Sequence, residues 1–394
     1  MRSHLENKIP LSLYIHIPWC AKKCPYCDFN SYALGKASAS ERAIPETAYI
    51  EKLEQDLLQD LLYAFNRPLQ SIFFGGGTPS LFSPISFEKI LNFVGKRMAF
   101  ASNIEITMEA NPGTLEHKDF KDYKAAGINR ISLGAQSFQD EKLKALGRIH
   151  QSKELYDALE SLDKAELYNF NIDIMHGLPN QTLNDAIYDL EQALSFQPSH
   201  LSWYHLTLEP NTYFHKYPPI LPSEDTTDII QSEGLTLLKS RGYRHYEVSA
   251  FAKLGSESRH NLNYWTFGDY LGIGAGAHGK LSDPTQKVIY RTAKTRSPIS
   301  YLNNQNDQLL SEFKMISESE YPFEFMLNAL RLTDEAIPFV LFEERCFLSR
   351  EVLFQRLTQA EKSGFLVVQS DSFILTEFGK RYLNDVIKLF LPNE

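Results

Sequence analysis

Short β-rich runs alternate with amphipathic helical stretches from residue 11 to about residue 250. Stretches such as TAYIEKLEQDLLQDLLYAF carry apolar residues three and four positions apart, which is typical of a helix with one buried face. The β-rich runs are LSLYIHI, LQSIFFGGG, NIEITMEAN, INRISLGAQ, YNFNIDIMHG and LSWYHLTLEP. Such strand–helix units in series predict an α/β fold with a parallel sheet and helical crossovers. Because a full TIM-like barrel needs eight units, we expect a partial, more open (β/α)6 barrel.

The chain has 394 residues, more than one compact core of ordinary size accommodates. We expect a core barrel over residues 1–250, an irregular bridging segment over 251–317 with HNLNYW and GIGAGAHG, and a small domain over 318–394. The last region shows helical patterns, then two short β runs about a turn in FLVVQSDSFILTEFG, then the helical KRYLNDVIKLF. This order predicts a winged-helix-like α+β module.

The composition predicts a soluble cytoplasmic protein. Hydrophobic residues make up 43% of the chain and charged residues 23%, and no apolar run approaches the roughly 18 residues of a membrane span. The first residues, MRSHLENKIP, lack the apolar segment of a secretory signal. A net charge of −9 argues against a nucleic-acid partner, because such binders usually display a basic surface.

Cys20, Cys24 and Cys27 form a C-x3-C-x2-C motif in a loop directly after the first β-rich run. Clustered cysteines in a cytosolic chain indicate metal ligands or a redox centre more readily than a disulfide framework. Three thiolates can hold three irons of a four-iron cluster and leave the fourth iron open to an exogenous ligand. The small, polar stretch ALGKASASERAIPET follows and predicts a loop before the first helix.

Two other interpretations of the three cysteines stay open from the residues alone. One is a zinc site completed by His16 or by a distant residue, although zinc usually takes four closed ligands in well-separated C-x2-C pairs. The other is inert packing of buried cysteines, which is uncommon for a cluster in a loop. The fourth cysteine, Cys346, lies on a helical pattern and predicts core packing.

Polar or glycine-rich residues follow almost every predicted strand. Ligands of parallel α/β folds lie at the carboxyl ends of the strands, so these residues outline one site that includes the cysteines. The run GGGTP at 75–79 lets a ligand approach the backbone closely. Carboxylate and amide side chains at strand ends suit ribose hydroxyls or an ammonium group, and an arginine can pair a carboxylate in a forked geometry. The side chains of these types are Glu109, Gln136, Asp173 and Arg148, although each alone is equally consistent with a satisfied polar residue at a barrel rim.

The cysteine motif, with Tyr26 just before its last cysteine, resembles the signature of the radical S-adenosylmethionine (SAM) superfamily. The wider string YIHIPWC with CPYCDF resembles its coproporphyrinogen oxidase-like branch. The resemblance implies a 4Fe-4S cluster on the three cysteines, with S-adenosylmethionine chelating the open iron through its methionyl amino and carboxylate groups. It carries S-adenosylmethionine contacts onto Tyr14, Gly76, Gly77, Thr78, Glu109, Gln136, Arg148 and Asp173.

Two groups compete within that branch, the oxygen-independent coproporphyrinogen III oxidases and the haem chaperones that resemble them. The oxidases typically carry one more cysteine, where this chain has Phe29, and a substantial N-terminal extension, where only thirteen residues precede Tyr14. His260 begins HNLNYW, which resembles an HNxxYW element linked to haem binding in the chaperones. An imidazole can ligate haem iron while neighbouring aromatic rings pack against the porphyrin. Chemistry alone favours an ordinary buried histidine in an aromatic cluster.

The resemblance therefore implies a haem chaperone that binds haem, a 4Fe-4S cluster and S-adenosylmethionine, and that delivers haem to recipient haem proteins. The alternative is a coproporphyrinogen III oxidase, a decarboxylase of haem biosynthesis. No catalytic residue is assigned. The expected partners are haem and the recipients, with peripheral membrane contact through the recipients and a homodimer left open.

Overall fold

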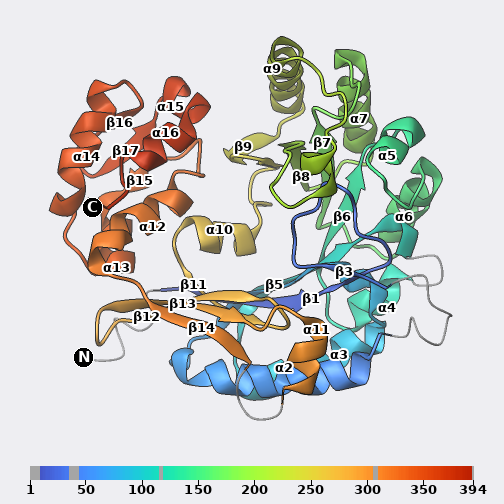
Figure 1. The fold of residues 1–394 in the computed structure, drawn as a ribbon, viewed down its shortest axis with the longest axis horizontal. Coiled ribbons are helices and arrows are strands. Elements are labelled where there is room, and N and C mark those ends of the chain that lie inside the picture. Colours follow the sequence, from blue (N-terminus) through green and yellow to red (C-terminus); the bar gives the residue numbers. More distant parts are fainter. Residues whose placement is uncertain (1–8, 35–43, 115–118, 305–308, 393–394) are drawn as a thin grey trace.

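The computed structural model describes residues 9–34, 44–114, 119–304 and 309–392. Most of the loop predicted after the cysteines, residues 35–43, lies outside the described residues. Within the described part of the chain, a twelve-stranded sheet forms the centre of the molecule (Figure 1). None of the helices described there has both the length and the apolar character of a membrane-crossing segment.

The predicted strands form the parallel middle of this sheet, in chain order. They are β1 (Leu11–Ile17), β4 (Leu69–Gly76), β5 (Phe100–Ala110), β6 (Arg130–Gln136), β7 (Phe170–His176) and β8 (His200–His205). Each pairs in parallel with the next, so their carboxyl ends lie at one edge. The expected α/β architecture with helical crossovers is confirmed.

Amphipathic helices connect these strands and pack on the sheet. They are α2 (Glu46–Asp60), α3 (Pro84–Arg97), α4 (Phe120–Ala125), α5 (Asp140–Ala145), α6 (Ser152–Lys164) and α7 (Leu183–Ser195). Two further helices, α8 (Tyr213–Lys216) and α9 (Glu224–Ser240), follow β8. Helix α6 shows why the local sequence forms a helix that packs on the sheet. A capping box begins it, and its apolar residues recur three and four apart, so that Leu155, Leu159 and Leu162 are all buried.

Residues 251–317 differ from the irregular bridge that we expected. They contain α10 (Arg259–Trp265), β11 (Asp269–Ile273), β12 (His278–Asp283), β13 (Val288–Lys294), α11 (Pro298–Asn303) and β14 (Leu310–Met315). Strand β11 pairs in parallel with β1, and β12, β13 and β14 continue the sheet in antiparallel order. The polar/apolar alternation that marks a half-exposed strand is missing here because β12 buries Lys280, which pairs with Asp269 at 3.0 Å. A Cβ on Gly272 would overlap the carbonyl oxygen of His278, so glycine permits the close approach of β11 and β12.

The opposite edge of the sheet consists of β10 (Ala250–Ala252) and β9 (Arg244–Glu247), with β10 antiparallel to β8. Two short strands, β2 (Trp19–Cys20) and β3 (Tyr32–Ala33), pair with each other and hold the two ends of the cysteine loop together.

The C-terminal region has its own hydrophobic cluster and a small antiparallel sheet. Its elements are α12 (Tyr321–Ala329), β15 (Ile337–Pro338), α13 (Phe339–Cys346), α14 (Glu351–Lys362), β16 (Leu366–Val368), β17 (Ser372–Leu375), α15 (Glu377–Arg381) and α16 (Leu383–Lys388). The predicted hairpin is present as β16 and β17, and β15 adds a third strand. Cys346 is fully buried in this cluster, as predicted for a core residue. Figure 1 shows α10 between this region and the large sheet.

Candidate cofactor site

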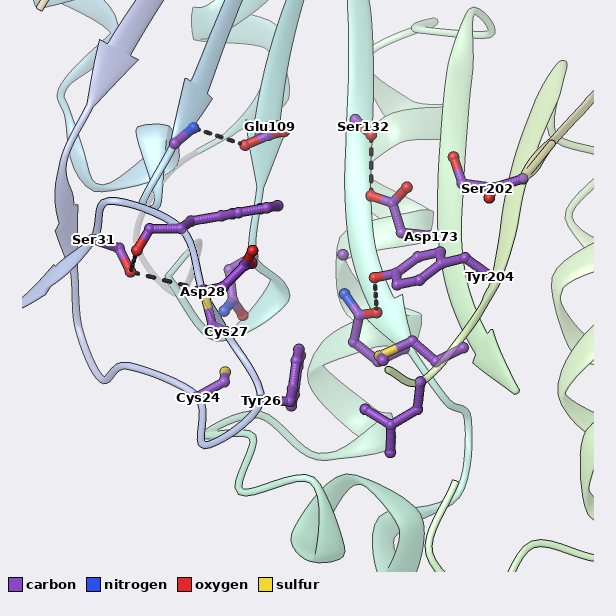
Figure 2. A pocket seen from close by; sticks show the side chains of 18 of the residues that line it. Cys24, Tyr26, Cys27, Asp28, Ser31, Glu109, Ser132, Asp173, Ser202 and Tyr204 are labelled. Atoms are coloured by element: carbon purple, nitrogen blue, oxygen red, sulfur yellow. Dashed lines mark hydrogen bonds between the residues drawn. The ribbon is translucent and has the colours of Figure 1, made fainter. Parts of the chain in front are cut away.

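A cavity of about 590 Å³ lies at the carboxyl ends of the parallel strands. Most of the residues predicted to form a site line it: Cys20, Cys24, Cys27, Gly76, Gly77, Thr78, Glu109, Gln136, Arg148 and Asp173. Figure 2 shows Cys24 and Cys27 on one side of this cavity and Asp173 and Tyr204 on the other. The order of the sheet brings these residues together, since they lie on or after five neighbouring parallel strands, β1, β4, β5, β6 and β7.

The cysteine loop presents three free thiols to the cavity. The backbone N–H of Cys27 donates to the carbonyl of Cys24 at 3.1 Å, which tightens the turn between them. Burial raises the pKa of the Cys20 and Cys27 thiols. Thiolates are the usual protein ligands of an iron-sulfur cluster, so this donor set fits a cluster held at three corners.

The alternative zinc site gains nothing from His16. Its Nε2–H donates to the carbonyl of Asn30 at 2.9 Å, so Nδ1 accepts from the Tyr14 hydroxyl at 3.0 Å. Both ring nitrogens are therefore in use. Among the residues that the structure describes, no three His, Cys, Asp or Glu side chains are grouped to hold a single metal ion, which is a different requirement from three thiols placed around a four-iron cluster.

The glycine run at the end of β4 packs directly against the start of the cysteine loop. The backbone N–H of Gly77 donates to the carbonyl oxygen of Ile17 at 2.7 Å, and the backbone N–H of Thr78 donates to the carbonyl oxygen of Trp19 at 2.8 Å. Gly76 has φ +112°, and a Cβ there would overlap the His16 ring. This close approach requires glycine, and it turns the Gly76 N–H toward Glu109 Oε2, 3.1 Å away.

Two acidic side chains, Glu109 and Asp173, form the wall opposite the cysteines. Burial and the nearby Asp173 raise the pKa of Glu109 to about 8. Burial also raises the pKa of Asp173, although Asp173 accepts a hydrogen bond from Ser132 at 3.1 Å (Figure 2) and one from Asn171 at 2.7 Å. Two buried carboxyl groups that face one cavity suit a ligand with an ammonium group and hydroxyls.

Gln136 extends this wall, and Arg148 links β6 to the cysteine loop. Gln136 has φ +69°, unusual for a residue with a Cβ, and its Oε1 accepts from the Tyr204 hydroxyl at 2.7 Å. Arg148 donates from Nη2 to the Gly134 carbonyl at 2.7 Å and from Nη1 to Cys24 Sγ at 3.7 Å. Its buried Nε has no hydrogen-bond partner within the described residues. A ligand carboxylate could accept from this nitrogen.

Two predicted residues, Tyr14 and His260, are not among those that line the cavity. Tyr14 lies beside it, since a Cβ on Gly75 would be 3.1 Å from the Tyr14 ring and 3.2 Å from Glu109 Oε2. His260 is only 1% exposed and stacks on Phe73 with 4.9 Å between ring centroids.

Both ring nitrogens of His260 are hydrogen-bonded. Its Nδ1 lies 2.9 Å from the Ser71 hydroxyl, which itself donates to Ser12, and its Nε2 lies 2.8 Å from the Tyr264 hydroxyl. Burial lowers the pKa of His260 to about 3. Haem ligation by His260 stays a prediction, and in this conformation neither nitrogen is free for it.

The structure adds residues that the sequence analysis did not assign to the site. Ser132, Tyr204 and Asn261 line the cavity, as does Arg331 of the C-terminal region. Ser132 and Tyr204 lie on predicted strands, so the rule that ligands bind at strand ends could have found them. No such signal marks Arg331, which lies far beyond the last of these strands.

The radical SAM superfamily model matches residues 14–193. A curated protein named "Heme chaperone HemW" from Haemophilus influenzae is 49% identical over 98% of this chain and 99% of its own length. The protein of the same name from Escherichia coli is 47% identical over 97% of this chain and 98% of its own length. The one from Bacillus subtilis is 32% identical over 96% of this chain and 99% of its own length.

Among solved structures, coproporphyrinogen III oxidase (HemN) from Escherichia coli shares the fold. Its TM-score is 0.79 at 21% identity, over 99% of this chain and 93% of that one. Membership of the radical SAM superfamily implies a 4Fe-4S cluster and S-adenosylmethionine, and the donors around the cavity fit both. Full-length similarity at these identities shows that the chain belongs to the HemW family of the radical SAM superfamily.

Proposed function

We propose that this protein is a haem chaperone, which binds haem and delivers it to recipient haem proteins. The observation that carries the proposal is the similarity over almost the whole chain to proteins named as haem chaperones. The cavity supports the cofactor part of this proposal, because the three thiols and the acidic wall that suit a cluster and S-adenosylmethionine line one space of about 590 Å³.

Within this proposal, Cys20, Cys24 and Cys27 hold the cluster. A cluster held by three thiolates has one iron open, and that iron offers S-adenosylmethionine a binding position. Gly76 brings the backbone close to the ligand and directs its N–H at Glu109. Asp173 supplies further acceptors for hydroxyl or ammonium groups, and the unpaired Nε of Arg148 supplies a donor for a carboxylate.

The oxidase alternative has less support. Likeness to HemN at 21% identity concerns the fold alone. Phe29, which stands where the oxidases typically have a further cysteine, lines the cavity with a ring that cannot ligate iron. Anaerobic incubation of the reconstituted protein with coproporphyrinogen III, S-adenosylmethionine and a reductant tests this alternative. We expect no protoporphyrinogen, and its rapid formation would remove the chaperone proposal.

A transfer experiment tests the chaperone function directly. The reconstituted protein is loaded with haem, freed of excess haem and mixed with an apo b-type cytochrome. We expect saturable binding of haem, then movement of the Soret absorbance to the cytochrome. A protein that shows no saturable haem binding would contradict the proposal. We place delivery in the cytoplasm, with any membrane contact made through the recipients, and a homodimer stays a prediction.

A further inference from the structure

The cavity continues past the cysteine loop to the junction with the C-terminal region. At this end it is lined by Glu247 at the end of β9, by Asn261 and Trp265 on α10, and by Arg331, which follows α12. The cluster and S-adenosylmethionine assignments use none of these four residues. This end of the cavity is therefore lined by residues that those assignments leave without a role, and it is continuous with the part that faces the cysteine loop.

The backbone of the C-terminal region holds Arg331 at this place. The N–H of Val248 donates to the Arg331 carbonyl at 3.1 Å, and Glu247 and Leu332 form a β-bridge. The side chain then lies over Trp265, with the guanidinium carbon 4.5 Å from the centre of the indole. Glu247 Oε2 lies 3.6 Å from Nη2, and Glu247 is itself fixed by the N–H of Ser249. Both ends of the arginine are thus held in position.

Two donors at this place have no acceptor. Nε of Arg331 and Nε1 of Trp265 are buried and make no hydrogen bond with any residue that the structure describes. Buried donors in folded proteins are nearly always paired, so two unpaired ones beside a cavity indicate a ligand with acceptor oxygens. A guanidinium fork matches a carboxylate, and the indole beneath it lines the cavity as an apolar neighbour for a flat ring system.

We propose that Arg331 and Trp265 form a subsite for a flat macrocycle that carries carboxylates, with Arg331 pairing a propionate of haem. This subsite rests on the proposed function, because it takes haem as the ligand. It places the propionate edge of haem in the same cavity as the cysteines, whichever group ligates the iron. It also assigns a role to the C-terminal region, which supplies the arginine.

The test compares haem with its dimethyl ester, in which both propionates are neutral. Binding of each is titrated by difference spectroscopy to the full-length reconstituted protein and to the Arg331→Gln and Arg331→Lys variants. The wild-type protein is expected to prefer haem by about tenfold to a hundredfold, the range typical of a charge-assisted hydrogen bond. Arg331→Gln is expected to abolish this preference, and Arg331→Lys to keep part of it, because lysine keeps the charge without the fork.

Arg381→Gln is the matched control. Arg381 also belongs to the C-terminal region and pairs with Asp228 of α9 at 3.3 Å, but both side chains are exposed and away from the cavity. This variant is expected to keep the full preference, which separates loss of the subsite from loosening of the C-terminal region. If Arg331→Gln kept the same ratio of haem affinity to ester affinity as the wild-type protein, the proposal would be overturned.

A wild-type protein that binds haem and ester equally would overturn the subsite while leaving the chaperone proposal intact. That result does not depend on whether any variant folds. A wild-type protein that binds neither compound would instead contradict the proposed function, and the subsite with it.

Discussion

Arg148 Nη1 donates a hydrogen bond to Cys24 Sγ at 3.7 Å, although 124 positions separate the two residues in the chain. The contact ties the loop after α5 to the cysteine loop after β1. Because Nη2 is already bonded to the Gly134 carbonyl at 2.7 Å, the guanidinium is fixed between the sheet and the thiol.

Replacing Arg148 by glutamine is expected to weaken binding of S-adenosylmethionine by about tenfold to a hundredfold, because the carboxylate loses a charged donor. Iron content should stay at the wild-type level, since the three thiols are unchanged. Equilibrium dialysis with labelled S-adenosylmethionine on the reconstituted protein measures this. Lys144→Gln, at an exposed position of α5, is the control. An unchanged affinity in Arg148→Gln would show that Arg148 only holds the cysteine loop in place and does not bind the S-adenosylmethionine carboxylate.

Replacing Cys24 by alanine is expected to remove the visible iron-sulfur absorbance and most of the bound iron, because two thiolates hold a four-iron cluster poorly. Iron and sulfide analysis after anaerobic reconstitution checks this. Cys346→Ala is the matched control, since Cys346 is buried in the C-terminal cluster. Full cluster content in Cys24→Ala would refute the assignment of the ligands, and zinc in place of iron in the wild-type protein would revive the zinc alternative.

Glu109 should make the stability of the cofactor-free protein depend on pH. Its pKa is raised from 4.5 to about 8, so the folded state binds a proton that the unfolded state releases between these values. The contribution of Glu109 to stability is therefore full below about pH 4.5 and is lost as pH rises through 8. Glu109→Gln should remove this decline, with a difference on the order of 4 kcal/mol between pH 5 and 9. Urea unfolding of both proteins at the two pH values measures it, and parallel declines would contradict the assignment.

Gly76→Ala is expected to destabilise the protein by about 3 kcal/mol or more, because the methyl group meets the His16 ring in addition to the strain of a positive φ. Gly364→Ala provides the comparison. Gly364 also has positive φ, at +76°, but no atom lies within 4 Å of its added Cβ, so about 1 kcal/mol is expected there. Urea unfolding midpoints give both values. Equal losses would mean that the close packing against His16 contributes nothing.

His260 can ligate haem only if it gives up one of its hydrogen bonds. Tyr264→Phe removes the hydroxyl that lies 2.8 Å from Nε2, so haem affinity should rise by about threefold to tenfold if that nitrogen takes the iron. His260→Ala should weaken haem binding without loss of iron from the cluster. Haem titrations of the two variants check this. Unchanged haem affinity in both, with lower stability in His260→Ala, would make His260 a purely structural residue.

The features that the sequence predicted well depend on neighbours in the chain. The alternation of strands and helices is local, and so is the spacing of Cys20, Cys24 and Cys27. Because parallel strands end at one edge of a sheet, the sequence predicted that Glu109, Gln136 and Asp173 line one site, without any knowledge of side-chain positions. All three line the cavity. The strands of residues 251–317 were not predicted, because buried Lys280 and the glycines of β11 and β12 interrupt the expected pattern.

The sequence alone determined that this chain builds a parallel α/β sheet with three thiols at the ends of its strands. Only the tertiary structure decided which face of α10 meets the cavity. Residues four apart share one side of a helix, so His260 and Tyr264 lie together, as do Asn261 and Trp265, and packing against β4 turned the second pair toward the site. Arg331 joined them because a bridge between Glu247 and Leu332, 85 positions apart, brings the C-terminal region to the cavity. Contacts of this length depend on the packing of whole elements, which no local pattern encodes.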